Sequence, residues 1–562
     1  MGRPERQASV GLATTAWHRI NWGACHRRVR SLQRRIVQVV QTGAWRKVKR
    51  LSYLLVHAFA VRALAVKRVT EHPGTKTPGG EGSLWDTPEK KAAAVAPIGR
   101  WRGYRPAPLK RIYLPKNNGQ QRPRSIPTLG DRARQAVYLQ ALQPIAETTG
   151  DQHSYGCRPK RRGAEAIDQC FKVLRQKTSA AWILAGDIQG FFDNIRFSWL
   201  EQHLPMNKRV LSKWLRSGFV DRGAQLPTTA GVPQGGIISP VISNMVLDGL
   251  EAIVQGGNWH RRVHNINYVR WADDFIVTAN SRQVFEETVL PRINAFLAAR
   301  GVRRSPTKTV ITPISQGFDF LGQTLRKYAR PQGKPAKLQM TPSKTRIQAL
   351  KGRVKALCKQ SAGSTPAQLI GTLTPVLRGW ANYHRHVICG TTFAQLDSFV
   401  WRRLCRWAKR RHPNKTGRWI AARYFPHDLG QSWRFTDPDT GTRILRMQEA
   451  VKPPRHLKVK GAANPFDPSW EAYFQHRDRQ LTLHASSPGR ANILRQQHGL
   501  CPVCRQVIPC EEALELHHRD GHQQHHRLVN LVLLHPTCHR QVHWAPERQT
   551  DEPRPSRGVG HA

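Results

Sequence analysis

Acidic residues are scarce in this chain. Its 562 residues include 36 Asp and Glu but 90 Lys and Arg, which leaves a formal net charge of +54. A folded protein with this excess repels itself unless a polyanion binds to it, and nucleic acid is the obvious polyanion. The charge balance therefore favours a nucleic-acid-binding protein over a generally basic soluble one.

Long apolar runs are missing as well. No stretch approaches the run of about 18 apolar residues that a membrane-spanning helix requires, and the N-terminal segment lacks the apolar core of a secretory signal. We therefore expect no membrane partner and a cytoplasmic location. The ten cysteines are dispersed except for Cys501, Cys504, Cys510 and Cys538, a pattern that favours one local metal site over a disulfide framework.

The chain divides into segments of different character. With 39% apolar residues it can form globular cores, and its length predicts about three or four domains. Basic amphipathic helices are expected over 26–70. From about 100 to 325, short apolar runs alternate with basic helical stretches, which is typical of an α+β domain. Residues 341–412 are again helical and basic, and a compact Cys/His-rich module follows at about 495–545.

The segment NYVRWADDFIVTA, residues 267–279, predicts two strands joined by ADD. This hairpin has Asp273 and Asp274 at its tip. Asp187 follows a separate apolar run and is expected at the end of another strand. Three carboxylates at strand ends can hold two Mg²⁺ ions about 3.5–4 Å apart, although aspartates at a hairpin more often only form the turn. The hairpin alone leaves both interpretations open.

Two flanking segments favour the metal-binding interpretation. Residues 230–250 contain a glycine-rich turn, PQGG, which opens an apolar helix and allows the backbone to approach a ligand closely. Residues 109–136 predict a basic hairpin with an NNG turn, with Lys116 before it and Arg122 after it. Two cations placed in this way can clamp a triphosphate, although cations beside a hairpin are usually only solvated.

The basic helical region at 341–412 has a mixed surface. The cations of its first helix are Arg346, Lys351, Arg353 and Lys355, and its apolar residues are Ile347, Leu350, Val354 and Leu357. We expect the apolar set to pack on the preceding domain while the cations face a phosphate backbone, although a single cation is usually only solvated. In RGWANYHRH, Trp380, Tyr383 and His384 have rings that can stack on bases, but burial in a core is the stronger expectation. Upstream, Ser198 and Glu201 form a capping-box pattern that predicts a helix start.

The C-terminal module contains a set of ligands with structural-zinc spacing. Cys501 and Cys504 form one Cys-x2-Cys pair, and His535 and Cys538 form a His-x2-Cys pair. Together they predict a tetrahedral Cys₃His site for Zn²⁺. Cys510 competes with His535 as the fourth ligand, and we favour His535 because two such pairs match the usual arrangement.

A second group of histidines lies within the same module. His539 and His543 are four residues apart, so they share one helix face and can bind one metal ion, which His517 completes from a strand. The adjacent His518 points the other way and is free to deprotonate water, while Asn530 can orient His518 or the local loop. The pattern HH…N…H-x3-H resembles an HNH (ββα-metal) endonuclease, which would use one divalent ion, Mg²⁺. The alternative, a structural zinc ribbon with incidental histidines, leaves the four histidines unexplained.

Eight segments, in chain order, resemble the blocks of a group II intron reverse transcriptase. They are KTPGGEG, LPKNNGQQRPRSIPTLGDR, HSYGCRPKRRGAEAI, AGDIQGFFDNI, GVPQGGIISPVISN, YVRWADDF, SPTKTVI and FDFLGQTL. The N-terminal helices, the LRGWANYHRHV and RWAKRRHP segments and the Cys/His module are similar to the family too. Blocks in the correct order are far more specific than any single motif.

The resemblance implies an α+β multidomain protein whose polymerase has the right-hand form. The expected parts are an N-terminal basic helical extension of the fingers (1–95), reverse transcriptase fingers and palm (96–330), a helical thumb or maturase domain (331–425), a DNA-binding region (426–490), an HNH endonuclease (491–546) and a disordered tail (547–562).

The resemblance also assigns roles within the polymerase. Asp187, Asp273 and Asp274 are expected to bind two Mg²⁺ ions. Lys116 and Arg122 would contact the phosphates of the incoming nucleotide, the Phe192 ring would lie under its sugar, and Gln234 and Gly235 would line its pocket. One departure is Trp271, where the family usually has Tyr. The larger ring lacks the hydroxyl and puts the rate and fidelity of the polymerase in doubt.

The function implied is that of a group II intron-encoded protein. It would bind its intron RNA, promote splicing, nick double-stranded target DNA with its HNH domain and extend the nicked end with dNTPs by reverse transcription, at the nucleoid of a bacterial cell. The alternative is an RNA-splicing maturase with weakened or lost polymerase activity. A free-standing HNH nuclease leaves the first 490 residues unexplained, and Phe192 disfavours an RNA-templated RNA polymerase.

Overall fold

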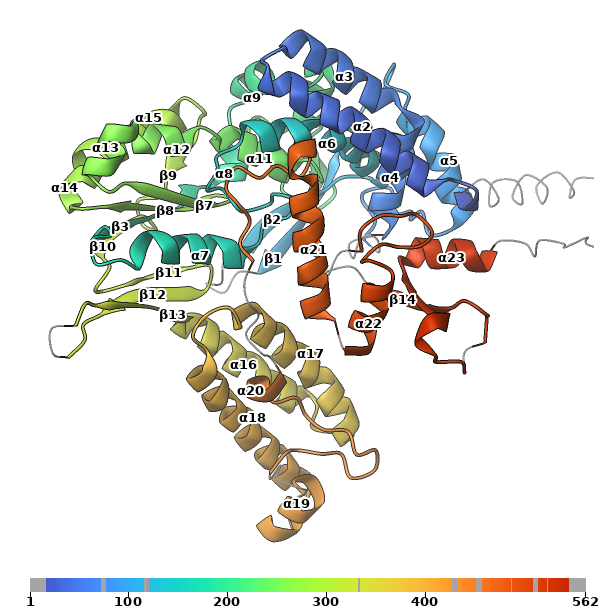
Figure 1. The fold of residues 1–562 in the computed structure, drawn as a ribbon, viewed down its shortest axis with the longest axis vertical. Coiled ribbons are helices and arrows are strands. Elements are labelled where there is room, and N and C mark those ends of the chain that lie inside the picture. Colours follow the sequence, from blue (N-terminus) through green and yellow to red (C-terminus); the bar gives the residue numbers. More distant parts are fainter. Residues whose placement is uncertain are drawn as a thin grey trace, which may run out of the picture.

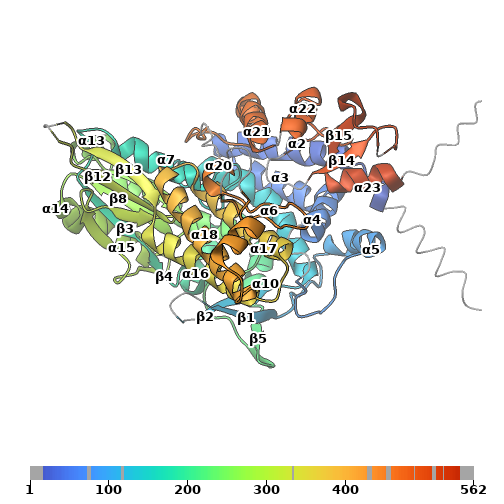
Figure 2. The same ribbon diagram turned by 90° about the horizontal axis from the view of Figure 1, so that it is seen from below.

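A computed structural model describes most of the chain, and Figures 1 and 2 show its arrangement from two directions. The described residues are 17–71, 77–115, 119, 121–331, 334–426, 433–450, 457–486, 488–508, 514–522 and 524–544. The N-terminal helices, the sheets and the C-terminal elements lie together, and residues 344–424 project from them as a helical bundle (Figure 1). The mixed α and β composition expected from the sequence is confirmed.

The N-terminal part is helical. Its helices are α2 (Trp22–Gln41), α3 (Trp45–His57), α4 (Phe59–Glu71), α5 (Pro88–Ile98) and α6 (Leu129–Thr149). The helical spacing expected over 26–70 is confirmed in α2, where Val29, Leu32 and Ile36 are buried. Because α2, α3, α4 and α5 all pack on α6, that helix is buried around most of its circumference and forms the centre of this part.

A four-stranded sheet with order β2-β1-β5-β6 adjoins these helices. Its strands are β1 (Leu109–Pro115), β2 (Gln121–Ile126), β5 (Phe219–Asp221) and β6 (Ala224–Leu226). The predicted basic hairpin is present, since β1 and β2 pair antiparallel with Leu114 opposite Arg122. Lys116 lies outside the described residues.

The second four-stranded sheet is buried on both faces. Its order is β10-β3-β8-β7, built from β3 (Trp182–Gly186), β7 (Asn267–Trp271), β8 (Asp274–Ala279) and β10 (Val310–Pro313). Alternate residues of β8 enter different cores: Phe275 and Val277 join the core of the N-terminal helices, whereas Ile276 joins the core beneath α7 (Gly163–Leu174). This double burial explains why these strands read as apolar runs in the sequence.

Short elements complete the region. They are β4 (Ile188–Gln189), α8 (Phe191–Asn194), α9 (Phe197–His203), α10 (Lys208–Leu215), α11 (Ser239–Leu247), α12 (Leu250–Gln255), α13 (Asn258–Val263), α14 (Arg282–Val284), η2 (Phe285–Val289), α15 (Leu290–Ala298) and β9 (Arg303–Arg304). The capping-box prediction was wrong about where α9 starts. Its N-cap is Arg196, without a side-chain cap, and Ser198 already lies inside the helix. Phe197 is buried, so packing of the first residue sets the start.

A three-stranded antiparallel sheet leads into the helical bundle. It comprises β11 (Phe318–Phe320), β12 (Gln323–Tyr328) and β13 (Lys337–Pro342), and the bundle comprises α16 (Lys344–Gln360), α17 (Pro366–His384), α18 (Gly390–Arg411) and α19 (Gly417–Tyr424). The apolar stripe of α16 was expected to pack on the preceding domain, and this was wrong. Leu350 and Val354 instead join the bundle's own core with α17 and α18. Arg346, Arg353 and Lys355 are exposed.

The segment expected as one DNA-binding region, 426–490, contacts two different cores. Its first part, with Phe435 and α20 (Met447–Ala450), packs on the helical bundle. Its second part, with η3 (Pro468–Trp470) and α21 (Glu471–Ala485), packs beside α7, where Phe474 joins that core and the buried Arg477 pairs with Glu165. The two parts of this segment therefore pack on different parts of the molecule.

The C-terminal module forms a small ββα unit. Its elements are α22 (Pro488–Gln496), β14 (Glu515–His518), η4 (Leu528–Asn530), β15 (Leu531–Leu534) and α23 (Pro536–Trp544). It lies beside α2 and α4 in both views (Figures 1 and 2). The Gln541 amide donates to the backbone carbonyls of His18 and Ile20, at 2.9 and 3.1 Å, so the two ends of the described chain are in contact.

None of the described helices has both the length and the apolar character that crossing a membrane requires.

Candidate functional site

The three aspartates predicted as metal ligands gather at one edge of the central sheet. β7 and β8 form the expected hairpin, with Trp271 paired to Asp274 and with Asp273 in the turn. On the other side of β8, Gly186 of β3 pairs with Phe275. Continuing this antiparallel register by one residue sets Asp187 opposite Asp274, on the neighbouring strand.

The electrostatics of this edge favour a bound cation. Desolvation by surrounding protein atoms, and then the charges of Asp273 and Asp187, raise the pKa of Asp274 to about 6. The pKa of Asp273 is raised as well, chiefly by desolvation, with Asp187 adding to the effect. Carboxylates that repel one another in this way are relieved when a divalent ion neutralises them. The residues therefore fit Mg²⁺ chemistry.

Lys308 is a site residue that the sequence interpretation did not single out. Its ammonium pairs with the Asp187 carboxylate, and its pKa is raised by that hydrogen bond. The backbone nitrogen of Ser305 donates to the Asp187 carbonyl at 2.8 Å, which places the SPTK turn beside this aspartate. The sequence signal that could have identified it is its position in SPTKTVI, one of the eight segments that resemble the family's blocks.

The turn that carries Asp273 is held from outside the hairpin. Ala272 adopts a left-handed conformation with φ +55°, which is uncommon for a residue with a Cβ. The segment HSYGC packs directly on it: the Tyr155 nitrogen donates to the Arg270 carbonyl at 2.9 Å. A Cβ on Gly156 would clash with the backbone nitrogen of Ala272 and lie 2.9 Å from the carbonyl carbon of Trp271. Glycine at 156 is therefore required for this close approach.

Arg270, one residue before Trp271, is fully buried and anchors the hairpin from below. Its guanidinium donates to Asp248 at 2.7 Å and to Asn244 at 3.1 Å, and it lies 3.8 Å from Asp151. A buried cation requires such partners, because an unpaired one costs several kcal/mol. The network ties β7 to α11 and to the segment that precedes the HSYGC loop.

Trp271, the departure from the family pattern, is half-buried. Its indole packs against the core beneath α7, near Leu321, and a Cβ on Gly163 would lie 3.9 Å from its ring. Gly163, at the start of α7, therefore lies at ordinary contact distance from the larger ring. The structure accommodates this substitution through its neighbours, without displacing the aspartate hairpin register.

The predicted nucleotide-pocket residues converge from three elements. The Arg122 guanidinium on β2 donates to the Gln234 side-chain oxygen at 3.0 Å. A Cβ on Gly235, which has φ +138°, would clash with the carbonyl oxygen of Ser125. The Val232 nitrogen donates to the Phe192 carbonyl at 2.6 Å, so the same glycine-rich loop also contacts α8. The charge of Arg122 lowers the pKa of Asp273, opposing its desolvation, which places this cation in electrostatic reach of the aspartates.

The three aromatic candidates of α17 divide between core and surface. His384 is buried and hydrogen-bonds Gln323, and the Trp380 ring packs against it at a tilt of 40° with centroids 4.1 Å apart. Tyr383 is 48% exposed, and its hydroxyl donates to the Leu321 carbonyl at 2.8 Å. Tyr383 is therefore the most exposed of the three.

The C-terminal module brings two groups of metal ligands together. The ligand atoms of Cys501, Cys504, His535 and Cys538 all lie within 4.8 Å of one another, in a buried site. Separations of this size suit a tetrahedral Zn²⁺ ion with bonds of about 2.0–2.3 Å, so the four residues fit that metal. Cys510, the competing ligand, lies outside the described residues.

The second group is His517, His539 and His543, whose nitrogens also lie within 4.8 Å of one another. The Nε2 atoms of His539 and His543 face each other at 3.1 Å, as two ligands of one ion would. Glu515 accepts from His539 Nδ1 at 2.8 Å, a contact that would fix the ring orientation of a metal ligand. Among the described residues, Asp187, Asp273 and Asp274 do not form so tight a group.

His518 and Asn530 occupy different positions beside this histidine group. His518 Nε2 lies 3.5 Å from His526 Nδ1, at the surface. The Asn530 amide donates to Asp520 and to the His525 carbonyl, both at 2.9 Å. Of the two roles considered for Asn530, the observed hydrogen bonds match the one of holding the local loop.

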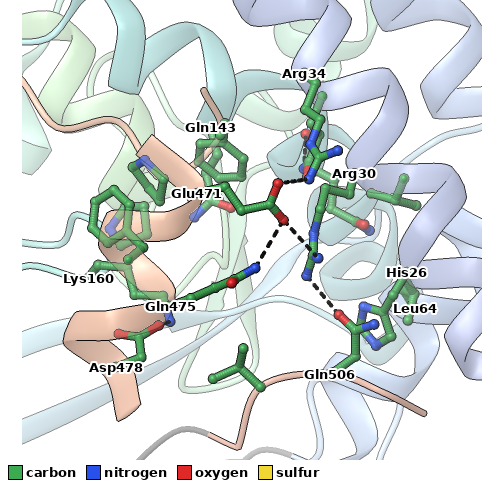
Figure 3. Close-up of a pocket in the computed structure, with 18 of the residues that line it drawn as sticks. His26, Arg30, Arg34, Leu64, Gln143, Lys160, Glu471, Gln475, Asp478 and Gln506 are labelled. Carbon is green, nitrogen blue, oxygen red and sulfur yellow. Dashed lines mark hydrogen bonds and ion pairs between the residues drawn. The ribbon is translucent and has the colours of Figure 1, made fainter. Parts of the chain in front are cut away.

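A cavity of about 630 Å³ separates the C-terminal elements from α2 and α4 (Figure 3). Ion pairs span it: the Glu471 carboxylate lies 2.5 Å from Arg34 and 3.9 Å from Arg30, and Arg30 also donates to Gln506 at 2.7 Å. Lys160 pairs with Asp478 at 2.7 Å. Carboxylates of the same chain thus neutralise much of the cationic lining. The ion pairs across the cavity connect the C-terminal segments to the N-terminal helices.

Three carboxylates at the edge of a central sheet, with a glycine-rich loop and a basic hairpin facing them, define a polymerase of the reverse transcriptase class. Residues 114–325 match the family described as reverse transcriptase (RNA-dependent DNA polymerase), and residues 17–98 match the N-terminal domain of reverse transcriptase. Residues 347–425 match the maturase-specific domain of group II introns. The chain belongs to the family of group II intron reverse transcriptase/maturases.

Curated relatives agree with this assignment. The chain is 28% identical to Protein YkfC of Escherichia coli (strain K12) over 345 residues, which cover 54% of this chain and 90% of that protein. It is 24% identical to the group II intron-encoded protein LtrA of Lactococcus lactis subsp. cremoris, over 53% of this chain and 63% of LtrA. An uncharacterized 91 kDa protein in a cob intron of Schizosaccharomyces pombe is 24% identical over 73% of this chain and 58% of its own length.

Proposed function

We propose that this protein copies RNA into DNA with its central sheet, binds and helps to splice its intron RNA, and nicks DNA with its C-terminal module. The observation that carries the polymerase proposal is the convergence of Asp187, Asp273 and Asp274 at the edge of one sheet. Arg122 and the glycine-rich loop that it contacts supply a phosphate-binding side to the same cleft.

In this proposal the residues divide the work of one nucleotide addition. Two Mg²⁺ ions, held by the three aspartates, would activate the primer 3′ hydroxyl and offset charge on the attacked phosphate and the departing pyrophosphate. Lys116 and Arg122 would orient the triphosphate, and the Gln234–Gly235 backbone would border the base pair. Phe192, whose backbone carbonyl accepts from the Val232 nitrogen, would place its ring under the sugar and disfavour a 2′-hydroxyl.

Primer extension on an RNA template tests the polymerase proposal. We expect dNTP incorporation by the parent and at least an approximately 100-fold loss in Asp273→Asn, because a metal-binding carboxylate is replaced by a neutral amide. Asp439→Asn, in an exposed turn beside the helical bundle, is the matched control and should retain the parent's rate. Absence of incorporation by the parent would overturn the proposal.

The nuclease proposal rests on the two ligand groups of the C-terminal module. Zn²⁺ at Cys501, Cys504, His535 and Cys538 would hold the fold, and one Mg²⁺ at His517, His539 and His543 would stabilise the scissile phosphate. His518 would take the proton from the attacking water, and Asn530 would hold the loop that carries Asp520. Plasmid nicking should be lost in His518→Ala and retained in Asp273→Asn. Equal loss in both variants would contradict two independent sites.

A second candidate is a splicing maturase with weakened polymerase activity, and Trp271 is the observation that favours it. The ring is accommodated against Leu321 and Gly163, but it lacks the hydroxyl of the usual tyrosine. Trp271→Tyr measured beside the parent distinguishes the two candidates. A rise in the extension rate, with unchanged splicing of the intron RNA, would identify Trp271 as the cause of a slow polymerase.

A further inference from the structure

A second large cavity lies away from the three aspartates. It has a volume of about 1120 Å³ and lies between α3, α6 and α9, with the loop at 204–208 on one side. α3 and α9 lie side by side at the top of Figure 1. Neither the aspartates nor Arg122 lines it, and the C-terminal module does not reach it. The functions proposed above leave this cavity unused.

Aromatic rings form its walls. On α3, Trp45 is 45% exposed and Tyr53 is 63% exposed, although large apolar side chains are usually covered. On α9, the Trp199 and His203 rings stack with centroids 4.3 Å apart and an interplanar angle of 9°. Deeper in the cavity, Trp101 packs edge-on against the ring of Tyr138 at 5.1 Å. The cavity thus presents several flat surfaces that are fixed by the surrounding helices.

Two polar atoms at the cavity have no partner in the part of the chain that the structure describes. The Ser52 hydroxyl and the Trp101 indole nitrogen are both shielded from solvent and make no hydrogen bond. Buried donors without a partner are rare, since each costs about 1–3 kcal/mol. Because a water-sized atom cannot reach either one, both lie behind the cavity surface and are not contacts for a ligand.

The rim of the cavity is cationic. Lys49 of α3, Lys208 of α10 and Arg300 line it, and neither helix carries an acidic residue. The acidic side chain in the cavity lining is Asp248, and Arg270 already neutralises it at 2.7 Å. Flat rings inside a basic rim match the base and the phosphate of a nucleotide, respectively.

We infer that this cavity binds unpaired nucleotides of an RNA strand, with bases between the aromatic walls and phosphates on the α3 and α10 cations. The choice of RNA as the strand rests on the proposed function, whereas the stacking site itself rests on the cavity, its exposed rings and its cations. A protein partner would gain less here, because the rim has a high density of one charge and the chain has a net charge of +54.

The test uses the full chain with a saturating primer–template duplex, which occupies the polymerase cleft. A fluorescein-labelled single-stranded oligouridylate containing 4-thiouridine is then added, and its affinity and photocrosslinks are measured. We expect crosslinks in Trp45–His57 or Phe197–His203, and roughly tenfold weaker binding in Trp45→Ala and in Tyr53→Ala, the usual size of a lost base–aromatic stack. Both side chains are exposed, so their removal leaves the core intact.

A matched variant separates this site from general charge attraction. Trp259, on α13, is 74% exposed and lies outside the cavity, so Trp259→Ala should bind within about twofold of the parent.

Three results would overturn the inference: unchanged affinity in Trp45→Ala and Tyr53→Ala, an equal loss in Trp259→Ala, or self-association in sedimentation that Trp45→Ala abolishes, which would mark a protein interface. Primer extension is measured in parallel and should be unaffected by Trp45→Ala. A parent that crosslinks at α3 but incorporates no dNTP would reject the polymerase proposal while retaining this binding site.

Discussion

The charge of Asp274 is unfavourable in the folded chain. The pKa of its carboxyl is raised from 3.8 to about 6 by desolvation and by the charges of Asp273 and Asp187. Ionisation is therefore harder in the folded than in the unfolded chain. The resulting loss of stability begins as the pH rises above 3.8, increases up to about pH 6 and is constant above it.

Asp274→Asn should consequently raise the thermal midpoint at pH 7.5 and raise it less at pH 5. After allowance for solvent screening of this exposed side chain, the gain at pH 7.5 is about 1 kcal/mol. Differential scanning fluorimetry in metal-free buffer measures it, with Asp439→Asn as the control. Added Mg²⁺ should stabilise the parent and shrink the difference between parent and variant; a gain that is independent of pH would contradict the charge explanation.

At the scale of single residues, the sequence was informative wherever the chemistry was local. The Asp273–Asp274 pair is recognisable because it lies between two apolar strands. The spacing of Cys501 and Cys504 indicates a pair of metal ligands. Lys308 was missed because its importance comes from its contact with Asp187, about 120 residues earlier in the chain. In a basic chain, the sequence does not distinguish an active-site lysine from a solvated one.

At the scale of elements, the aspartate hairpin depends on a loop that is not itself part of a β-strand. HSYGC lies across Trp271 and Ala272, and Gly156 is the point of closest approach. The hairpin was predictable from its two strand-like apolar segments and the ADD turn between them. The loop that packs across the hairpin was not predictable, because the contact joins segments more than 100 residues apart. Its only sign in the sequence is a single glycine.

Gly156→Ala should cost the polymerase about 100-fold in rate, because the new methyl group meets backbone atoms of the turn and displaces Asp273 by a fraction of an ångström or more. Single-turnover primer extension measures this loss. Gly352→Ala is the matched control, since a Cβ there meets nothing within 4 Å on the surface of α16. That variant should keep full activity and gain about 0.5–1 kcal/mol from helix propensity. Equal rates in the two variants would rule out the proposed packing of the loop on the turn.

Two predictions about elements failed for the same physical reason. α9 begins at the buried Phe197 and not after a capping box at Ser198. The apolar stripe of α16 packs within the bundle and not on the preceding domain. Local patterns identify which face of a helix is buried, and even which residues can cap it, but tertiary packing decides the partner and the exact end.

At the scale of the whole molecule, the C-terminal module is attached to the first helices. Thr537 and Arg540 contact Glu71, and Gln541 contacts the His18 and Ile20 carbonyls. Acidic residues are few, yet Glu71, Glu471 and Asp478 all lie at this junction (Figure 3). A sequence pattern cannot reveal such pairing across the length of the chain.

The integrity of this junction should depend on the Cys₃His site. Cys538→Ser, or treatment with a strong zinc chelator, should make the region after residue 487 sensitive to limited proteolysis and abolish nicking, because structural zinc supplies much of the folding energy of such modules. Primer extension should persist. Cys405→Ser in the bundle is the matched control and should leave the proteolytic pattern unchanged. Identical digestion with and without chelator would contradict a structural metal.

The contact between Gly23 and Cys504 also sets an order in time. A Cβ on Gly23 would lie 3.1 Å from the Cys504 carbonyl, so the C-terminal module packs closely on this part of α2. About 480 residues separate the two positions, and a ribosome that adds about 5–20 residues per second needs roughly half a minute to a minute and a half to bridge them. During that interval α2 and its arginines emerge uncovered beside the messenger that encodes them. If that messenger carries the intron, the nascent chain can meet its own RNA before the covering module has been made.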